Sequence, residues 1–381
     1  MEAATALLRP RRPRDTRARL RIADVSMFYG ERSGGIRTYL DEKVAWAVAD
    51  GACEHHLIVP GRRERHDPAD GASMRHELPS LRVAAANGYR VPVGGRGLRD
   101  TLRLVRPDVV LLHDPFWRPH EACAVVQAAG GAAVMVHHGS ADLDAGAIPG
   151  PHRVYRRGFE SWLRHAYAPA DAVMAACDAR PDVGRHAELE LRFGLHPAFR
   201  PRPATRGDHV LYAGRLSREK GIFTLLEAAA AASEPWPLRL MGAGTAQDAV
   251  TAHARRLGLE RRVTLHPYEP DRAALARLYA TARCVVMPGP WETFGLVAFE
   301  AAASGASVVA CETAPSAARL GPLAHTFAPE DPIALDRAIA AARAAEPDAA
   351  AAARFAARHT WGEAFARELS DLGRLVAARA A

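Results

Sequence analysis

Short apolar runs alternate along the chain with longer segments that have a helical period. The run at 20–27 (LRIADVSM) predicts a first strand, a glycine-bearing loop follows at 30–35, and 36–49 has the spacing of a helix. Four later runs predict further strands at 56–60, 107–113, 132–137 and 172–176. The strand at 172–176 is expected to be the last one of this half. Several of them are continuously apolar, which is typical of parallel strands covered on both faces. The first half therefore predicts a parallel α/β sheet.

The same pattern restarts after a proline-rich stretch at 197–207. A loop at 214–221 and a helix at 222–232 lie among five predicted strands: 209–213, 237–241, 262–265, 284–287 and 307–310. We expect two doubly wound, Rossmann-like domains, 20–203 and 204–358. Because ligands bind beyond the carboxyl ends of parallel strands, these edges are expected to face a shared cleft.

A last amphipathic helix is predicted at 359–381, with apolar residues at 361, 365, 369, 372 and 375. This helix either caps the second domain or crosses back onto the first. A length of 381 residues agrees with two domains, because it exceeds what one ordinary core accommodates.

Charge changes this picture only at the N-terminus. The formal net charge is +7, and six arginines face two acidic residues in 1–19. That segment predicts a disordered basic arm, with a peripheral contact to the inner membrane face as the alternative. No stripe of interleaved basic and aromatic residues is present, so we expect no nucleic-acid partner.

Cysteine and lysine usage adds two expectations. The five cysteines are far apart, odd in number and without metal-ligand spacing, which predicts free thiols in a reducing compartment. No run approaches the roughly 20 apolar residues that span a bilayer, so a cytoplasmic protein is expected. Lys43 and Lys220 are the only lysines among fifty basic residues, which makes both of them candidates for a specific role.

The strongest chemical signal lies at 288–300 (PGPWETFGLVAFE), where a predicted strand ends and a helix begins. A helix start offers unpaired amides and partial positive charge, which suit a diphosphate. Glu292 precedes the helix, where its carboxylate can accept hydrogen bonds from sugar hydroxyls. Glu300 lies two turns inside, among apolar neighbours, and can reach a ribose diol. The alternative is a helix-capping Glu292 and a surface Glu300, although an idle carboxylate among apolar residues would be costly.

A second signal is the loop at 212–221 (YAGRLSREKG). A strand delivers Gly214 and Arg215 at its carboxyl end, and Lys220 follows just before a helix. Arg215 suits a forked contact with a diphosphate, and Lys220 suits a point-charge contact. A solvated basic loop is the alternative.

These two segments, in this order and spacing, resemble family 4 of the retaining GT-B glycosyltransferases. The resemblance covers most of the chain and is strongest from about 209 to 310. It implies a nucleotide-sugar donor, held mainly by the second domain, and no metal ion. By position, Arg215 and Lys220 would hold the diphosphate, Glu292 the donor sugar and Glu300 the ribose. Backbone atoms would complete the donor contacts, from these positions: Gly214, Thr293, Phe294, Gly295, Leu296 and Val297.

The first domain adds weaker matches to the same family. Gly34 and Gly35 fall at the family's glycine-rich loop, where bare backbone can approach a phosphate, although an ordinary turn is the alternative. His138 resembles the histidine that contacts the transferred sugar, and His137 is its rival for that role. His113 and Asp114 end another predicted strand and are candidates for the acceptor pocket.

Two features depart from the family or imitate another one. The family's Gly-Gly-x-x-Glu turn is replaced by 311–316 (CETAPS), so donor contacts there are expected to differ. The segment 142–144 (DLD) looks like the metal motif of a different transferase fold, and its place in a first-domain loop favours coincidence.

The sequence therefore predicts a metal-independent, retaining glycosyltransferase that uses a UDP, GDP or ADP sugar and an unidentified acceptor hydroxyl. The nucleotide sugar is a co-substrate, and no cofactor is expected. Two rival functions stay open on the sequence. One is an inverting transferase or nucleotide-sugar epimerase with the same architecture. The other is a non-catalytic protein that binds sugar nucleotides.

Overall fold

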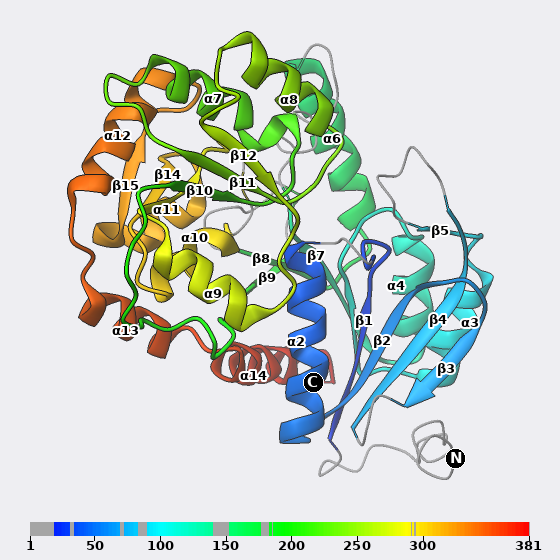
Figure 1. Cartoon of the computed structure of the whole chain (residues 1–381). Helices are drawn as coiled ribbons and strands as arrows, with labels where there is room; N and C mark the ends of the chain where they lie inside the picture. The colour runs from blue at the N-terminus through cyan, green and yellow to red at the C-terminus, as the bar shows by residue number, and fades with distance from the viewer. Residues whose placement is uncertain are drawn as a thin grey trace. The chain divides into compact units, whose positions relative to one another are not determined.

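A computed structural model describes the chain as two compact units (Figure 1). It describes residues 19–30, 34–68, 72–82, 90–139, 152–176, 183–184, 186–290, 292 and 295–380. The predicted basic arm therefore lies outside the described residues, apart from Arg19. The first unit contains the chain up to His138, Arg153–Phe193 and the C-terminal helix, and the second contains Gly194–Thr360.

The first unit is built on a nine-stranded sheet of order β3-β4-β2-β1-β6-β7-β8-β9, with β5 paired to β4. Its strands are β1 (Leu20–Val25), β2 (Cys53–Gly61), β3 (Arg65–Pro68), β4 (Ser73–Arg82), β5 (Arg90–Pro92), β6 (Val109–Leu112), β7 (Ala132–His137), β8 (Ala172–Ala175) and β9 (Ala187–Glu190). All pairs are parallel except β3–β4 and β4–β5. The prediction that the strand at 172–176 ends this sheet is wrong, because β9 pairs with β8.

Helices cover both faces of this sheet. They are α2 (Gly35–Asp50), α3 (Arg96–Val105), α4 (Pro119–Ala128), α6 (His152–Tyr167) and α14 (Trp361–Ala380). Neighbouring residues of a strand point to opposite faces. Val25 of β1 therefore joins the apolar core with α3 and α4, whereas Asp24 faces α2 and α14. Figure 1 shows α14 against α2, so the C-terminal helix packs on the first unit.

The second unit has a six-stranded parallel sheet of order β12-β11-β10-β13-β14-β15. Its strands are β10 (Val210–Ala213), β11 (Leu238–Met241), β12 (Val263–His266), β13 (Cys284–Met287), β14 (Val308–Cys311) and β15 (Ala324–Phe327). Its helices are η2 (Arg218–Lys220), α7 (Ile222–Ala231), α8 (Gln247–Arg256), α9 (Arg272–Thr281), α10 (Leu296–Ala303), α11 (Pro315–Leu320), η3 (Gly321–Leu323), α12 (Pro332–Ala344) and α13 (Ala349–Arg358). The described chain is thus an α/β protein with two Rossmann-like sheets, as the sequence predicts.

The sequence did not predict five strands, β3, β4, β5, β9 and β15, and three of them have weak apolar signals. β3 (RHDP) and β9 (AELE) contain few apolar residues, and none of their residues is fully buried. The same holds for most of β15 (AHTF). These three strands form sheet edges, where one side has no neighbouring strand, and so their sequences need not be apolar.

Candidate active site

In the second unit, the loops that follow β10, β11 and β13 pack directly on one another. Gly221 has φ of 68°, and a Cβ there would lie 2.4 Å from the carbonyl oxygen of Pro288. A Cβ on Gly242 would lie 2.0 Å from the carbonyl oxygen of Gly214. Only glycine allows such close backbone contact. The three loops therefore form one surface at the carboxyl edge of the sheet.

Lys220 and Glu292 meet on this surface. The Lys220 ammonium donates to both carboxylate oxygens of Glu292, each at 2.8 Å. The two side chains keep 22% and 14% of their surface exposed. The structure thus brings together two residues that the sequence placed 72 positions apart in separate motifs. Because this pair is partly exposed, a charged ligand can reach it and replace one of its members.

Arg215 supplies a second positive charge at the end of β10. Within the described chain its guanidinium makes no hydrogen bond or ion pair. Its carbonyl oxygen accepts from the hydroxyl of Tyr212 at 2.6 Å, which fixes the backbone of the loop. Burial, and then the nearby Glu292, raises the pKa of the Tyr212 hydroxyl well above its usual value, so this hydroxyl stays a donor.

The start of α10 offers uncapped amides on the same side of the sheet. Gly295 precedes the helix with φ of 66°, and no described side chain caps it. Leu296 and Val297 in the first turn are half-buried. The predicted donor residues Thr293 and Phe294 lie outside the described residues. Amides in this arrangement carry partial positive charge and attract anions.

Glu300 is buried and has two partners that the sequence analysis missed. Its side chain lies 3.5 Å from the guanidinium of Arg272 and accepts from the hydroxyl of Tyr279 at 3.3 Å. Both partners come from α9, and their distance from Glu300 along the sequence gives no indication of the contact. Burial, and then Glu300, raises the pKa of the Tyr279 hydroxyl well above its usual value. The proposed contact between Glu300 and a ribose stays a prediction.

The segment that departs from the family pattern, 311–316, contacts the β13 loop. The Thr313 hydroxyl donates to the carbonyl oxygen of Pro290 at 2.8 Å. Ser316 is fully buried, and its hydroxyl has no partner in the described chain. A Cβ on Gly295 would lie 2.5 Å from that hydroxyl. The segment therefore supports the start of α10 directly.

The first unit contains a buried charge network around Asp24, which the sequence analysis did not anticipate. Its carboxylate lies 2.9 Å from the Lys43 ammonium and accepts from ring nitrogens of His55 at 2.8 Å and His113 at 2.6 Å. Lys43 also pairs with Glu368 of α14 at 2.6 Å. Burial alone would raise the pKa of Asp24, but Lys43 and the two histidines hold it well below its usual value. The rarity of lysine was the one sequence signal for this network.

His138 is linked to the network through His113. The two rings stack with centroids 4.9 Å apart, and His113 Nδ1 lies 2.6 Å from His138 Nε2. The His113 ring thus bridges Asp24, through Nε2, and His138, through Nδ1. Burial, and then His113, lowers the pKa of His138 well below its usual value. His137 instead has a different partner, because its Nδ1 lies 3.0 Å from the Tyr167 hydroxyl.

The other first-unit candidates take different positions. Gly34 precedes α2, where no described side chain caps the helix, and a Cβ there would meet no described atom within 4 Å. Gly35 is the first residue of that helix. Asp114 is buried, and its carboxylate accepts from three backbone N–H groups that follow β1 and β6. It therefore fixes loops. The acceptor role of His113 and Asp114 stays a prediction.

Three remaining expectations concern thiols, metals and membranes. Cys53, Cys123, Cys284 and Cys311 are free and buried, whereas Cys177 and the segment 142–144 lie outside the described residues. Among the described residues, no group of three or more His, Cys, Asp or Glu side chains could hold a metal ion. None of the described helices has the length and hydropathy needed to cross a bilayer.

Known families match both halves of the chain. Residues 33–179 match the family described as Glycosyltransferase Family 4, and residues 199–358 match Glycosyl transferases group 1. A relative from Mycobacterium tuberculosis, a GDP-mannose-dependent alpha-(1-6)-phosphatidylinositol dimannoside mannosyltransferase, is 32% identical over 77% of this chain and 80% of its own. The chain belongs to glycosyltransferase family 4. A glycogen synthase of the same species is 31% identical over 69% of this transferase and 71% of its own length.

Solved structures share the fold of this transferase. Sucrose-phosphate synthase from Thermosynechococcus elongatus superposes with a TM-score of 0.73 at 20% identity, over 94% of this chain and 100% of that one. HepE from Anabaena, solved with UDP and glucose, gives a TM-score of 0.68 at 19% identity, over 92% and 99%. The fold is therefore the GT-B fold, as the resemblance implied, and the protein is a glycosyltransferase.

Proposed function

We propose that this glycosyltransferase moves a hexose from a nucleoside diphosphate sugar to an acceptor hydroxyl, without a metal ion and with retention at the anomeric carbon. The observation that carries the proposal is the arrangement at the carboxyl edge of the second sheet. Among the described residues, Lys220 is paired only with Glu292, Arg215 has no side-chain partner, and no side chain caps α10. Together they form a cationic site of the kind that suits a diphosphate.

The donor would bind by replacing an internal ion pair. The diphosphate would take the ammonium of Lys220 and the guanidinium of Arg215, and the amides of Gly295 to Val297 would meet its distal phosphate. Glu292 would then be free to accept hydrogen bonds from the hydroxyls of the sugar. The partial exposure of Lys220 and Glu292 supports such an exchange.

The reaction would begin as the bond between the anomeric carbon and the phosphate oxygen loosens. Its electrons pass to the leaving phosphate, whose charge is stabilised by Arg215, Lys220 and the helix amides. The acceptor oxygen attacks from the face that the phosphate leaves, and the phosphate takes the acceptor's proton. His138 would contact the transferred sugar as a neutral ring, because its pKa lies well below the usual value.

The nucleotide is tested by thermal stabilisation. A ligand that binds only the folded state raises stability by RT ln(1 + [L]/Kd). UDP, GDP, ADP and their common sugar conjugates would be compared, with and without EDTA, and GDP-mannose is the first donor to test because one relative is named GDP-mannose-dependent. We expect one nucleotide to raise Tm with EDTA present. Loss of the shift on chelation would contradict metal independence, and no shift with any nucleotide would contradict the donor site.

The stereochemical outcome needs a separate measurement. NMR of the early product with the identified donor should show the donor's own anomeric configuration. The opposite configuration would establish an inverting transferase on the same fold.

A further inference from the structure

Three side chains of the first unit form a row that leads from its interior toward its surface. Asp24 and His113 expose at most 2% of their surface, whereas His138 is only partly buried. Oδ1 of Asp24 lies 2.6 Å from Nε2 of His113, and Nδ1 of His113 lies 2.6 Å from Nε2 of His138. Of these three side chains, His138 is therefore the one that a substrate can reach.

The buried end of the row is held from several elements. Besides His113, the Asp24 carboxylate of β1 has Lys43 of α2 at 2.9 Å and His55 of β2 at 2.8 Å. Lys43 in turn contacts Glu368 of α14 at 2.6 Å. Hydrogen bonds to a charged group are strong, and the carboxylate cannot rotate without losing some of them. Asp24 is therefore a fixed anchor for His113.

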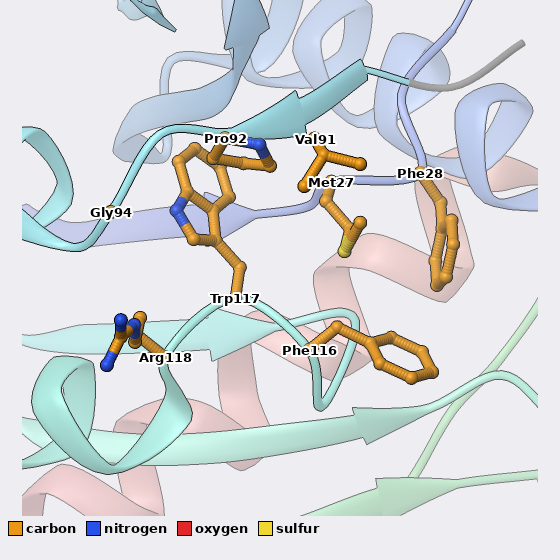
Figure 2. Close-up of a pocket in the computed structure, with 8 residues that line it drawn as sticks. All are labelled: Met27, Phe28, Val91, Pro92, Gly94, Phe116, Trp117 and Arg118. Carbon is orange, nitrogen blue, oxygen red and sulfur yellow. The ribbon is translucent and has the colours of Figure 1, made fainter. Parts of the chain in front are cut away.

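The backbone beside His113 is fixed as well. Asp114, the next residue, accepts from the N–H of Met27 in the loop after β1 at 2.7 Å. It also accepts from the N–H groups of Phe116 and Trp117 in the loop after β6, both at 3.1 Å. Figure 2 shows side chains of these two loops lining one pocket. The two loops are thus joined next to the point where His113 enters the row.

The rings of His113 and His138 are held against each other. The two residues directly follow the neighbouring strands β6 and β7, and their rings stack with 20° between the planes. The ring of Tyr39 packs on both, with centroids 5.5 Å from His113 and 6.0 Å from His138. Both nitrogens of His113 are engaged by protein groups. Its ring therefore cannot turn without breaking a hydrogen bond, and neither nitrogen is left for a substrate.

This arrangement controls the chemistry of the His138 ring. Burial, and then His113, lowers the pKa of His138 well below its usual value, so the ring is neutral. In a neutral histidine, the hydrogen bond at one ring nitrogen determines which of the two nitrogens carries the proton. Because Nε2 is engaged by His113, a hydrogen bond between this ring and a sugar hydroxyl uses Nδ1.

We propose that His113, anchored on Asp24, is a positioning residue for the sugar transfer and fixes both the orientation and the protonated nitrogen of the His138 ring. This role rests on the proposed function, because His113 acts on the transferred sugar only through His138. A contact with a reacting group has to be held within a fraction of an ångström, and supporting hydrogen bonds achieve this.

His113→Gln separates this role from packing. The amide nitrogen of glutamine takes the place of Nε2 and can still donate to Asp24, but no atom takes the place of Nδ1. His55→Gln is the matched control. His55 is equally buried and also contacts Asp24 through Nε2, but its Nδ1 lies 2.9 Å from the Ser73 hydroxyl and not at His138. We expect similar losses in the free energy of unfolding for the two variants, measured by urea denaturation.

The first measurement needs no ligand. In the full chain labelled with ¹⁵N-histidine, the ring nitrogen shifts of His138 show which nitrogen is protonated, and their loss in His138→Ala assigns them. We expect one tautomer in the wild type and in His55→Gln, and a mixture of both tautomers in His113→Gln. Unchanged shifts in His113→Gln would overturn the proposal, and so would the same mixture in His55→Gln.

The second measurement is kinetic. It follows nucleotide release from GDP-mannose, or from the nucleotide sugar that stabilises the protein in its place. His113→Gln should lower kcat about tenfold, as expected for a slightly displaced contact, without changing the stabilisation by the free nucleotide. His55→Gln should keep the wild-type kcat. Adding His113→Gln to His138→Ala should lower kcat by no more than a further factor of about two, because coupled residues are not additive. A further tenfold loss would show that His113 acts independently of His138.

The two measurements separate this inference from the proposed function. If His138→Ala lowers kcat but His113→Gln changes neither the His138 shifts nor kcat, only the positioning role fails. If His138→Ala leaves kcat unchanged, the contact between His138 and the sugar fails and takes the positioning role with it, whereas the donor site stands. If no nucleotide sugar binds, the proposed function itself fails.

Discussion

The two units of this transferase differ in how far their paired charged side chains are buried. In the first unit, Asp24, Lys43 and Glu368 expose at most 3% of their side chains, and every one has a partner within the network. In the second unit, Lys220 and Glu292 form a single pair that remains partly exposed. The charges of the first unit are neutralised entirely by other protein groups. Those of the second unit remain accessible to a ligand.

Because of this difference, we expect charged residues in the two units to have different roles. A fully buried ion pair that loses one partner leaves an uncompensated charge, so its removal is strongly destabilising. A partly exposed pair keeps contact with water, so its removal costs less stability than that of a fully buried pair. We therefore expect the charges of the first unit to affect folding, and those of the second to affect donor binding and turnover.

The strongest test of this comparison removes the buried cation. Lys43→Met keeps the length of the side chain but leaves Asp24 and Glu368 without their ammonium. We expect the free energy of unfolding of the first unit to fall by about 3–5 kcal/mol, measured by urea denaturation. Arg367→Gln, which breaks an exposed pair with Glu363 on α14, should cost at most about 0.5 kcal/mol. A loss below about 1 kcal/mol for Lys43→Met would contradict the structural role.

The matching change in the second unit is Lys220→Met. Removing one preorganised cation from a leaving group should lower kcat about 100-fold or more, while the free energy of unfolding changes by about 1 kcal/mol or less. Arg218→Gln is the control, because Arg218 belongs to the same short helix but lies over the ring of Phe223 at 5.0 Å. Normal kcat in Lys220→Met would remove Lys220 from the mechanism.

A third test uses a row of histidines in the first unit. His76 lies between His56 at 2.9 Å and His66 at 2.8 Å, and burial lowers the pKa of His76 from 6.5 to about 3. Below pH 6.5 the unfolded chain binds a proton here that the folded protein does not. The free energy of unfolding is therefore not reduced by His76 above pH 6.5, and it falls progressively as the pH is lowered toward 3.

The expected loss is about 1.4 kcal/mol per pH unit, or about 2 kcal/mol between pH 6.5 and pH 5. His76→Gln should flatten this slope, which urea denaturation at a series of pH values measures. An equally steep acid slope in the variant would show that another group is responsible.

The smallest expected effect concerns Glu300. Glu300→Gln keeps the shape of the side chain but weakens its contacts with Arg272 and with a ribose diol. We expect the donor KM to rise about tenfold, which corresponds to one hydrogen bond to a charged group, with kcat unchanged. Glu312→Gln, on an exposed residue after β14, should leave the donor KM unaffected. A normal KM in Glu300→Gln would place the ribose elsewhere.

Much of the fold could be predicted from the sequence because the relevant signals are local. The apolar runs at 132–137 and 284–287 coincide with β7 and β13, and the helix predicted at 222–232 is α7 within a residue. Lys220 and Glu292 were each placed beyond the carboxyl end of a strand, where ligands bind. Their pairing was not predicted, because it depends on β10 and β13 being neighbours in the sheet.

Other contacts could not be predicted, because they join distant chain segments. The carboxylate of Asp114 accepts from the backbone amides of Met27, Phe116 and Trp117, and its predicted role in an acceptor pocket stays a prediction.

The sequence by itself determined the α/β pattern, the two sheets and the glycine-containing loops of the second unit, because strand and helix periods are read within ten to twenty residues. Only the tertiary structure decided which charged side chains are buried and paired with other protein groups. Tyr39 bonds to Glu368 across 329 positions, and this contact forms because α14 packs beside α2. A buried charge needs a partner in space, and the sequence does not show how far along the chain that partner lies.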